Sequence, residues 1–362
     1  MINKKLMDFL CEETSWEDLG NQNLLHGCPE FGEAVGAAIN DGALIGYTKE
    51  LSGRLDKMDM YKASLLSNFI GFACEKENDA SAGEEIVRLF ARSCQKVYEL
   101  FLSMDEDSDT SVPDDIRESC GGNKEQAGAY YGFDILCVST MAFLTRDAAL
   151  RKRLFDMGVS EAVRYLSEDA AESPYLRSVH YVNYMLSTCS DLKLLVLYPE
   201  KKKGFYAAAN DINNCFHLLF LMEEQIYKKL GDEYGMKEFA AHGSLVKLAH
   251  GEYPDDCWDK HYGTYFMECN YVTAQHDTFE NDDVMSMIWG EMAPESIPQI
   301  DGRAVIVLFG TGINRGFSAD FLAVPHEALK PYVEIERELD REEYDGWIGK
   351  IMNQLCVNAE NR

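Results

Sequence analysis

The chain has few basic residues for its length, and it lacks the sequence marks of secreted and membrane proteins. It carries 34 Lys and Arg against 62 Asp and Glu, a formal net charge of −28. Such a surface repels phosphate backbones, so nucleic acid is not an expected partner. The first apolar run is interrupted at Glu12 and Glu13, too early for a signal peptide, and we find no stretch near the ~20 apolar residues of a membrane span. We therefore expect a soluble protein of the cytoplasm.

The eleven cysteines form no CxxC pair and no short-spaced cluster. An odd number of scattered cysteines is typical of reduced, mostly buried thiols in a cytosolic protein. A chain of 362 residues with 46% hydrophobic residues is long enough to bury a sizeable core, and this length favours two domains. We expect it to fold without disulfides or a structural metal.

Hydrophobic spacing predicts helices through residues 1–245. The longest candidate runs from about Phe205 to Leu230 and is the expected central helix. No repeat of about 33 to 47 residues is present, which disfavours a regular solenoid. The predicted fold of this domain is an irregular helical bundle or a HEAT-like helical stack, with an exposed acidic loop at about 105–122. The other expected helices lie near 3–12, 30–40, 44–56, 59–75, 81–101, 124–145, 147–167, after 173, and 236–249.

After about Gly251 the hydrophobic period changes from that of helices to that of strands. Strands are predicted at 264–275, 303–310, 317–324 and 331–338, followed by an amphipathic helix at 344–355. The links are too short for helical crossovers, so the sheet is expected to be antiparallel. Residues 251–362 hold 22 acidic and 8 basic residues. The sequence thus predicts a small acidic α+β domain over 251–362, in a protein that is mainly α.

Histidines and cysteines gather between residues 242 and 276. Both types of side chain can ligate zinc, but structural zinc sites usually come as tight pairs such as CxxC. Here the one pair at helical i,i+4 spacing is Cys257 with His261. The candidate metal ligands are His250, Cys257 and His261. The alternative is a set of partly buried, hydrogen-bonded histidines, in which case no cofactor is expected.

The pair Cys257-Trp258 invites a catalytic interpretation, because a Cys followed by Trp stands at the nucleophile of several cysteine peptidases and transglutaminase-like enzymes. His276 and Asp277 are the local residues that can activate and orient such a thiol. The two acidic residues at 255 and 256 oppose it, since nearby negative charge raises a thiol pKa. A hydrolase, metal-dependent or cysteine-based, that uses segment 242–276 is the second hypothesis.

Two further motifs are incomplete. Residues 105–109 begin like a calcium-binding loop, but Thr110 and Ile116 occupy the positions that need Gly and a bidentate Glu. The glycine-rich stretch 310–316 follows an apolar strand as phosphate loops do, yet the residues after it predict a strand rather than a helix. We interpret it as a hairpin turn, with Arg315 at its tip placed to contact an anionic ligand.

The preferred hypothesis is a non-catalytic intracellular protein-binding protein. It is of inhibitor or immunity type, and its acidic C-terminal domain masks a basic protein partner such as a toxin or nuclease. A third hypothesis is a helical scaffold that binds through the N-terminal domain. Solubility alone, as in ordinary bacterial proteins, also accounts for the charge. The predicted binding residues are aromatic and charged: Trp258, Tyr262, Trp289, Arg315, Glu334, Glu336 and Glu338.

Overall fold

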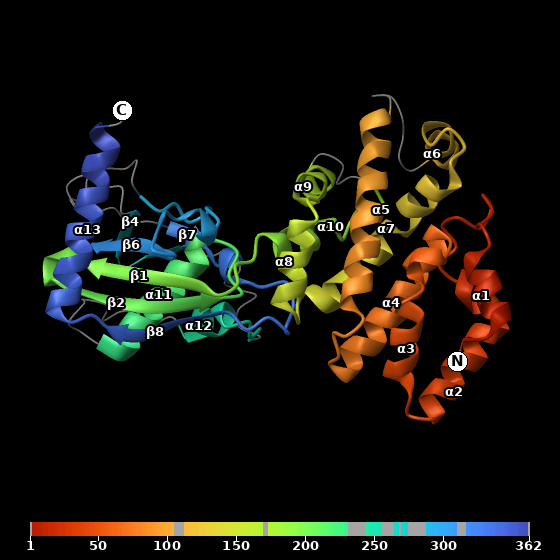
Figure 1. Ribbon diagram of the computed structural model, residues 1–362, viewed down its shortest axis with the longest axis horizontal. Helices are drawn as coiled ribbons and strands as arrows, with labels where there is room; N and C mark the ends of the chain where they lie inside the picture. Colours follow the sequence, from red (N-terminus) through yellow and green to blue (C-terminus); the bar gives the residue numbers. More distant parts are fainter. Residues whose placement is uncertain are drawn as a thin grey trace. The chain divides into compact units, whose positions relative to one another are not determined.

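The chain divides into two compact units, Met1–Leu186 and Ser187–Arg362. The computed structural model describes residues 2–104, 112–168, 173–230, 243–254, 264–267, 269–273, 287–309 and 316–360. The first unit is helical, and the second holds a sheet with helices (Figure 1). This confirms the predicted order, a helical region followed by an α+β region. The division falls well before residue 245, where the helical domain was predicted to end, because residues 192–210 form two strands.

The first unit is an irregular helical bundle centred on α7 (Lys124–Leu144). This helix packs against both α4 (Met60–Glu77) and α5 (Gly83–Ser103), although α4 lies far from it along the chain. Repeats in a linear helical stack contact only their neighbours, so the arrangement is that of a bundle. The other elements are α1 (Lys4–Cys11), η1 (Leu24–Gly27), α2 (Pro29–Asn40), α3 (Leu44–Ser52), η2 (Leu55–Lys57), α6 (Pro113–Ser119), α8 (Ala148–Asp156), α9 (Ser160–Glu168) and α10 (Val179–Leu186).

Small residues let α4 and α7 approach each other closely. A Cβ added at Gly132 would lie 2.6 Å from Cβ of Ser64 on α4, a separation that packed carbon atoms do not adopt. Further along the same seam, the Ser67 hydroxyl donates to Oγ of Ser139 at 3.0 Å. The contact between α4 and α7 is therefore held by close backbone approach and by a buried hydrogen bond.

One helix of the described part of the chain, α7, is long and apolar enough to cross a membrane by length and composition. In the structure 83% of its most apolar window is buried inside the first unit. Such burial is what the core helix of a soluble protein shows. This helix was predicted at 124–145, but its small polar residues interrupt the apolar run, so it did not stand out as a possible membrane span.

The predicted loop at 105–122 is only partly a loop. Residues 105–111 lie outside the described part of the chain, and α6 occupies much of the remainder. Pro113 stands at the first helical position, where its missing N–H costs nothing, and Ile116 is fully buried. One buried side chain and a favourable start are enough to order this short helix.

The second unit is built on a mixed sheet with strand order β4-β6-β1-β2-β8. Its strands are β1 (Leu192–Tyr198), β2 (Lys203–Asn210), β4 (Asn270–Thr273), β6 (Arg303–Phe309) and β8 (Tyr332–Glu338), with β5 (Gln299–Ile300) also paired to β6. β1 and β6 run parallel, and the other described pairs are antiparallel. The purely antiparallel sheet was thus wrong in one pairing, because helix α11 (Cys215–Leu230) lies between β2 and the later strands and supplies the crossover.

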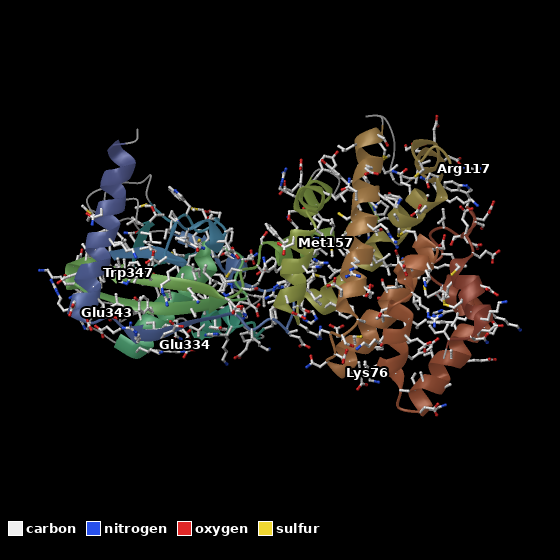
Figure 2. All side chains as sticks on the ribbon, in the orientation of Figure 1. Lys76, Arg117, Met157, Glu334, Glu343 and Trp347 are labelled. Carbon is white, nitrogen blue, oxygen red and sulfur yellow. The ribbon has the colours of Figure 1, made fainter. Side chains whose placement is uncertain are left out.

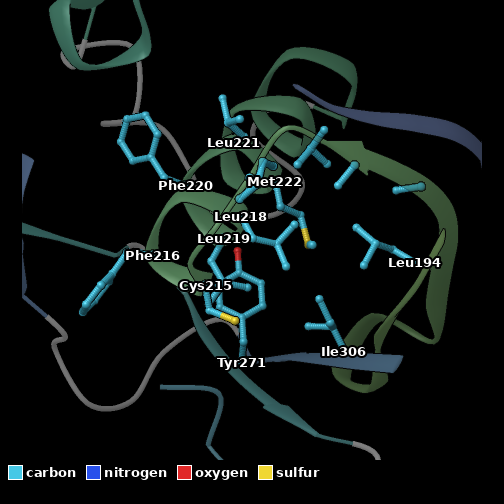
Figure 3. Close-up of a cluster of buried hydrophobic side chains, with 14 of the residues drawn as sticks. Leu194, Cys215, Phe216, Leu218, Leu219, Phe220, Leu221, Met222, Tyr271 and Ile306 are labelled. Carbon is cyan, nitrogen blue, oxygen red and sulfur yellow. The ribbon is translucent and has the colours of Figure 1, made fainter. Parts of the chain in front are cut away.

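Helices cover both faces of this sheet. α11 packs on one face, against residues such as Leu194 of β1 and Ile306 of β6 (Figure 3). α13 (Arg341–Glu360) packs on the other, where Tyr344 and Ile351 contact the alternate β1 residues 195 and 197. The predicted helix over 205–230 is corrected accordingly: its first part is strand β2, and the helix begins at Cys215.

Short elements complete the second unit. They are η3 (Pro199–Lys201), α12 (Gly243–Ala249), β3 (Thr264–Phe266), η8 (Pro294–Ser296), β7 (Gly316–Ser318) and η9 (Ala319–Leu322). β7 pairs with β3 in a separate two-stranded sheet, whereas β6 pairs in the main sheet. The predicted hairpin turn at 310–316 lies, apart from Gly316, outside the described residues, and the flanking strands β6 and β7 belong to different sheets.

Candidate functional site

Most of the sequence-predicted site residues of segment 242–276 lie outside the residues that the structure describes. The cysteine-based and zinc-based hydrolase hypotheses depend on them, so both stay predictions. The same holds for three of the predicted binding residues. The residues concerned are Cys257, Trp258, His261, Tyr262, His276, Asp277 and Arg315.

His250, the described member of the metal hypothesis, is engaged by protein groups at both ring nitrogens. Nε2 lies 2.8 Å from Oε2 of Glu224, and Nδ1 lies 3.2 Å from the carbonyl oxygen of Pro331. Both neighbours are acceptors when Glu224 is ionised, so the ring satisfies both as an imidazolium. Among the described residues no group of three potential ligands is placed to hold a metal ion. In this state His250 is an ion-pair partner, with no nitrogen free for a metal.

The electrostatics of the pair follow from this geometry. The hydrogen bond that His250 donates to Glu224 raises the pKa of His250 against the opposing effect of burial. Burial pushes the pKa of Glu224 upward, but His250 and Lys228, which donates to Oε1 of the same carboxylate, together bring it below its usual value. The Glu224 side chain is 1% exposed. A buried carboxylate therefore depends on two cations for its charge.

Two other polar side chains of α11, His217 and Glu223, are also buried. His217 is fully buried, with Nε2 2.6 Å from the carbonyl oxygen of Ala249, and its Nδ1 has no hydrogen-bond partner. Burial lowers its pKa to about 4. Glu223 accepts hydrogen bonds from the Cys269 amide at 3.2 Å and the Tyr271 hydroxyl at 3.3 Å. Neither residue was predicted as functional from the sequence, since His217 lies inside the apolar run 215–222 and Glu223 is the polar residue that directly follows it.

The three glutamates of β8 do not share one face. Residues 335 and 337 pair with the adjacent β2 residues 207 and 206, so Glu336 is an extra residue in the ladder. Such a β-bulge shifts the alternation of the side chains that follow it. Glu338 pairs with Phe205, which lies on the α11 side, whereas Glu334 pairs with Ala208 on the opposite side. Strict alternation along the predicted strand would place all three glutamates on one face, and the bulge prevents this.

Two of these glutamates are also compensated by cations. Glu338 lies 3.2 Å from Lys203, and Glu336 lies 3.9 Å from Arg303. Glu334 has no ion-pair partner among the residues that the structure describes. The outward negative charge of this strand is therefore much weaker than its sequence implies.

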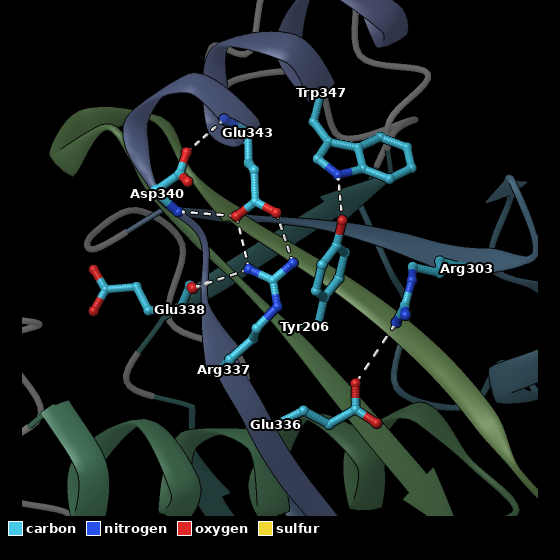
Figure 4. A network of polar contacts seen from close by, with 8 residues as sticks. All are labelled: Tyr206, Arg303, Glu336, Arg337, Glu338, Asp340, Glu343 and Trp347. Carbon is cyan, nitrogen blue, oxygen red and sulfur yellow. Dashed lines mark hydrogen bonds and ion pairs between the residues drawn. The ribbon is translucent and has the colours of Figure 1, made fainter.

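Aromatic and guanidinium groups instead tie α13 to the sheet (Figure 4). The guanidinium carbons of Arg303 and Arg337 lie 4.0 and 4.7 Å from the ring centroid of Tyr206, close enough for cation–π attraction. Arg337 also makes two hydrogen bonds to Glu343 at the start of α13. The Trp347 indole N–H donates to the Tyr206 hydroxyl at 2.8 Å. Trp347 thus stabilises the packing of α13 on the sheet.

We expect Trp347→Phe to lower the free energy of unfolding by about 1 kcal/mol. A smaller aromatic ring remains in place of the indole, and the hydrogen bond to Tyr206 is lost. Tyr206→Phe should cost a similar amount, and the double variant should cost little more than either single change. Urea denaturation of the four proteins measures this coupling, and losses that simply add would contradict it.

Trp289 is half exposed, with 50% of its surface accessible. The segment that follows it caps the N-terminus of α11. The Gly290 carbonyl accepts from the Phe216 amide at 2.8 Å, and the Met292 carbonyl accepts from the Cys215 amide at 2.9 Å. The indole is thus held on an ordered segment, as the prediction of a binding aromatic requires. Its role in binding stays a prediction.

The charge is shared equally between the units. Residues 1–186 contain 32 acidic and 18 basic residues, and residues 187–362 contain 30 and 16, a net −14 in each. The higher charge density assigned to 251–362 arose because the nearly neutral strands and helix at 187–250 were counted with the helical domain. The net charge therefore does not single out the C-terminal unit as the more acidic one.

An apolar hollow opens on the first unit between α2, α3 and α4. It has a volume of about 310 Å³, and two of its large apolar side chains, Phe72 and Ile39, are 67% and 58% exposed. Lys76, which is labelled in Figure 2, also lines the hollow, together with Glu77. The sequence analysis did not single out this site, although Phe69 and Phe72, three residues apart on one predicted helix, lie beside its buried stripe. Its other lining residues are Gly42, Leu44, Ile45, Gly46, Phe69 and Ala73.

The comparisons with known proteins give no relatives. No family model, no curated protein and no solved structure matches this chain.

Proposed function

We propose that this chain is a non-catalytic protein-binding protein that holds a basic partner in the hollow between α2, α3 and α4. The observation that carries the proposal is the exposure of Phe72 and Ile39 beside a concave apolar surface. Large apolar side chains gathered at a hollow are typical of protein-interaction sites, and aromatic anchors contribute most of the binding energy at such sites.

The charge of the unit defines the chemistry of the partner. With a net −14 over residues 1–186, the unit attracts positively charged molecules before contact. The occupant that fits is an amphipathic helix whose apolar side chains enter the hollow and whose Lys and Arg residues are attracted by the net negative charge of the unit. An inhibitor or immunity-type role toward a basic toxin or nuclease is the form of this function that we favour.

The hollow favours the N-terminal region over the C-terminal domain as the binding surface. On β8 the bulge separates the glutamates, and Lys203 and Arg303 pair with two of them. By contrast, the apolar side chains of Phe72 and Ile39 stay exposed in the described part of the chain. The scaffold hypothesis and the basic-partner hypothesis are thereby combined in one proposal.

Selection from a displayed library of random peptides tests the proposal. We expect the full chain to enrich peptides with apolar residues at helical i,i+4 spacing flanked by Lys or Arg. Phe72→Ser should weaken their binding about thirtyfold, the effect of losing an aromatic anchor. Association should slow as salt rises, because the Debye length falls from about 30 Å at 0.01 M to about 10 Å at 0.1 M.

A matched control is Phe155→Ser on α8. Phe155 is 57% exposed on the same unit but does not line the hollow, so its loss should leave binding unchanged. Both side chains are largely exposed, and each change should alter stability by only about 0.5 kcal/mol. Enriched peptides that are acidic, or that bind Phe72→Ser as well as the parent, would refute the proposal.

A further inference from the structure

A second hollow of the first unit lies between α5 and the turn that follows α3. Its volume is about 320 Å³. Leu55 and Leu89, both 2% exposed, form its apolar part. Arg88 and Arg92, one helical turn apart on α5, line it together with Asp56 and Glu85. None of these residues belongs to the apolar hollow of the proposed function, so the two sites are separate.

The two arginines differ in their partners. Arg88 is occupied, with Nη2 2.8 Å from Oε1 of Glu84 and Nη1 3.6 Å from Oε2 of Glu85. Arg92 makes no ion pair with any residue that the structure describes, and its Nε is closed off from solvent without a hydrogen-bond acceptor. A buried guanidinium N–H without an acceptor is unusual in a chain with 62 acidic residues, because buried donors of charged groups are costly to leave unpaired.

Asp56 is the counterpart of Arg92 in this hollow. It is exposed and has no ion-pair partner among the described residues. The hollow thus presents one uncompensated positive and one uncompensated negative group that do not pair with each other, above an apolar base. We infer that it binds a small zwitterion of the α-amino acid class, whose carboxylate meets Arg92 and whose ammonium group meets Asp56. Leu55 and Leu89 receive an apolar side chain.

Isothermal titration of the full chain with each of the twenty L-α-amino acids tests this inference. At least one apolar amino acid should bind saturably with one site per chain. Its methyl ester and its N-acetyl derivative should each bind at least about tenfold more weakly, since each lacks one of the two charges. The measurement needs no protein partner, so its outcome is independent of the proposed function.

Two variants each remove one of the two charged groups of the hollow. Arg92→Met and Asp56→Asn should each reduce affinity about tenfold, and Asp56→Asn is an exposed change that should leave the fold intact. Arg164→Met removes an exposed arginine of α9 that pairs with Glu168, and it should bind like the parent. The inference fails if no amino acid binds saturably, or if binding is unchanged in both Arg92→Met and Asp56→Asn.

Discussion

Replacing Gly290 with alanine should lower the free energy of unfolding of the second unit by about 3 kcal/mol. An added Cβ would lie 2.2 Å from Cγ of Phe216 and 2.3 Å from both of its Cδ atoms. The ring has little room to retreat, because it packs against the rings of Phe317 and Phe321, at centroid distances of 5.2 and 4.8 Å. Moving the backbone instead would break the hydrogen bond from the Phe216 amide to the Gly290 carbonyl.

Gly349→Ala is the matched control. Gly349 lies on α13, where an added Cβ meets no atom within 4 Å, and alanine is favoured over glycine inside a helix by roughly 0.5 to 1 kcal/mol. We therefore expect a small gain in stability from the same chemical change. Urea denaturation followed by near-UV circular dichroism measures both variants. A loss below about 1 kcal/mol for Gly290→Ala would mean that the 287–292 segment is not packed on α11 as described.

The second large effect is a dependence of stability on pH that belongs to His250. Its pKa is raised in the folded state by Glu224, so the folded protein holds this proton more tightly than the unfolded one. The resulting stabilisation is complete below the unfolded pKa of about 6.5 and is lost as pH rises through the folded value. The pKa of Glu224 is lowered, so its contribution is present above an unfolded pKa of about 4.3 and disappears as pH falls further.

His250→Ala should therefore cost about 2 kcal/mol near pH 6, because the buried carboxylate keeps only Lys228 as a partner. The cost should shrink as pH rises above neutrality, since the parent loses its proton there. His250→Gln, which keeps a hydrogen-bond donor but cannot titrate, should remove the same portion of the pH dependence. Denaturation midpoints between pH 5 and pH 9 test this, and parallel profiles for parent and His250→Gln would contradict the ion pair.

His217 provides a control of opposite sign. Burial lowers its pKa to about 4, so its contribution is present above the unfolded pKa of about 6.5 and is lost as pH falls toward the folded value. His217→Gln should make the protein less sensitive to acid while leaving the alkaline side unchanged. The two histidines, one neutral and buried, the other charged and paired, can thus be separated in one series of measurements.

How far the site could be read from the sequence differs from residue to residue. Trp289 and Glu334 stand exposed, as a binding role requires. His250 was predicted as a metal ligand, but its partner Glu224 is 26 residues away along the chain. No periodic pattern in one segment reports a contact between two segments. The apolar hollow was equally hidden, since it depends on how α2, α3 and α4 pack together.

The sequence by itself determined the helical first region, the strands at 303–309 and 332–338, and the terminal helix, because one-sided burial leaves a clear hydrophobic period in each. Only the tertiary structure decided that residues 192–198 form a central strand. Leu194 packs under α11 and Leu195 under α13, and a strand buried on both faces has no alternation to distinguish it from a buried helix. The pairing of β8 with β2 likewise decided the bulge at Glu336, because register depends on the partner strand as much as on the strand itself.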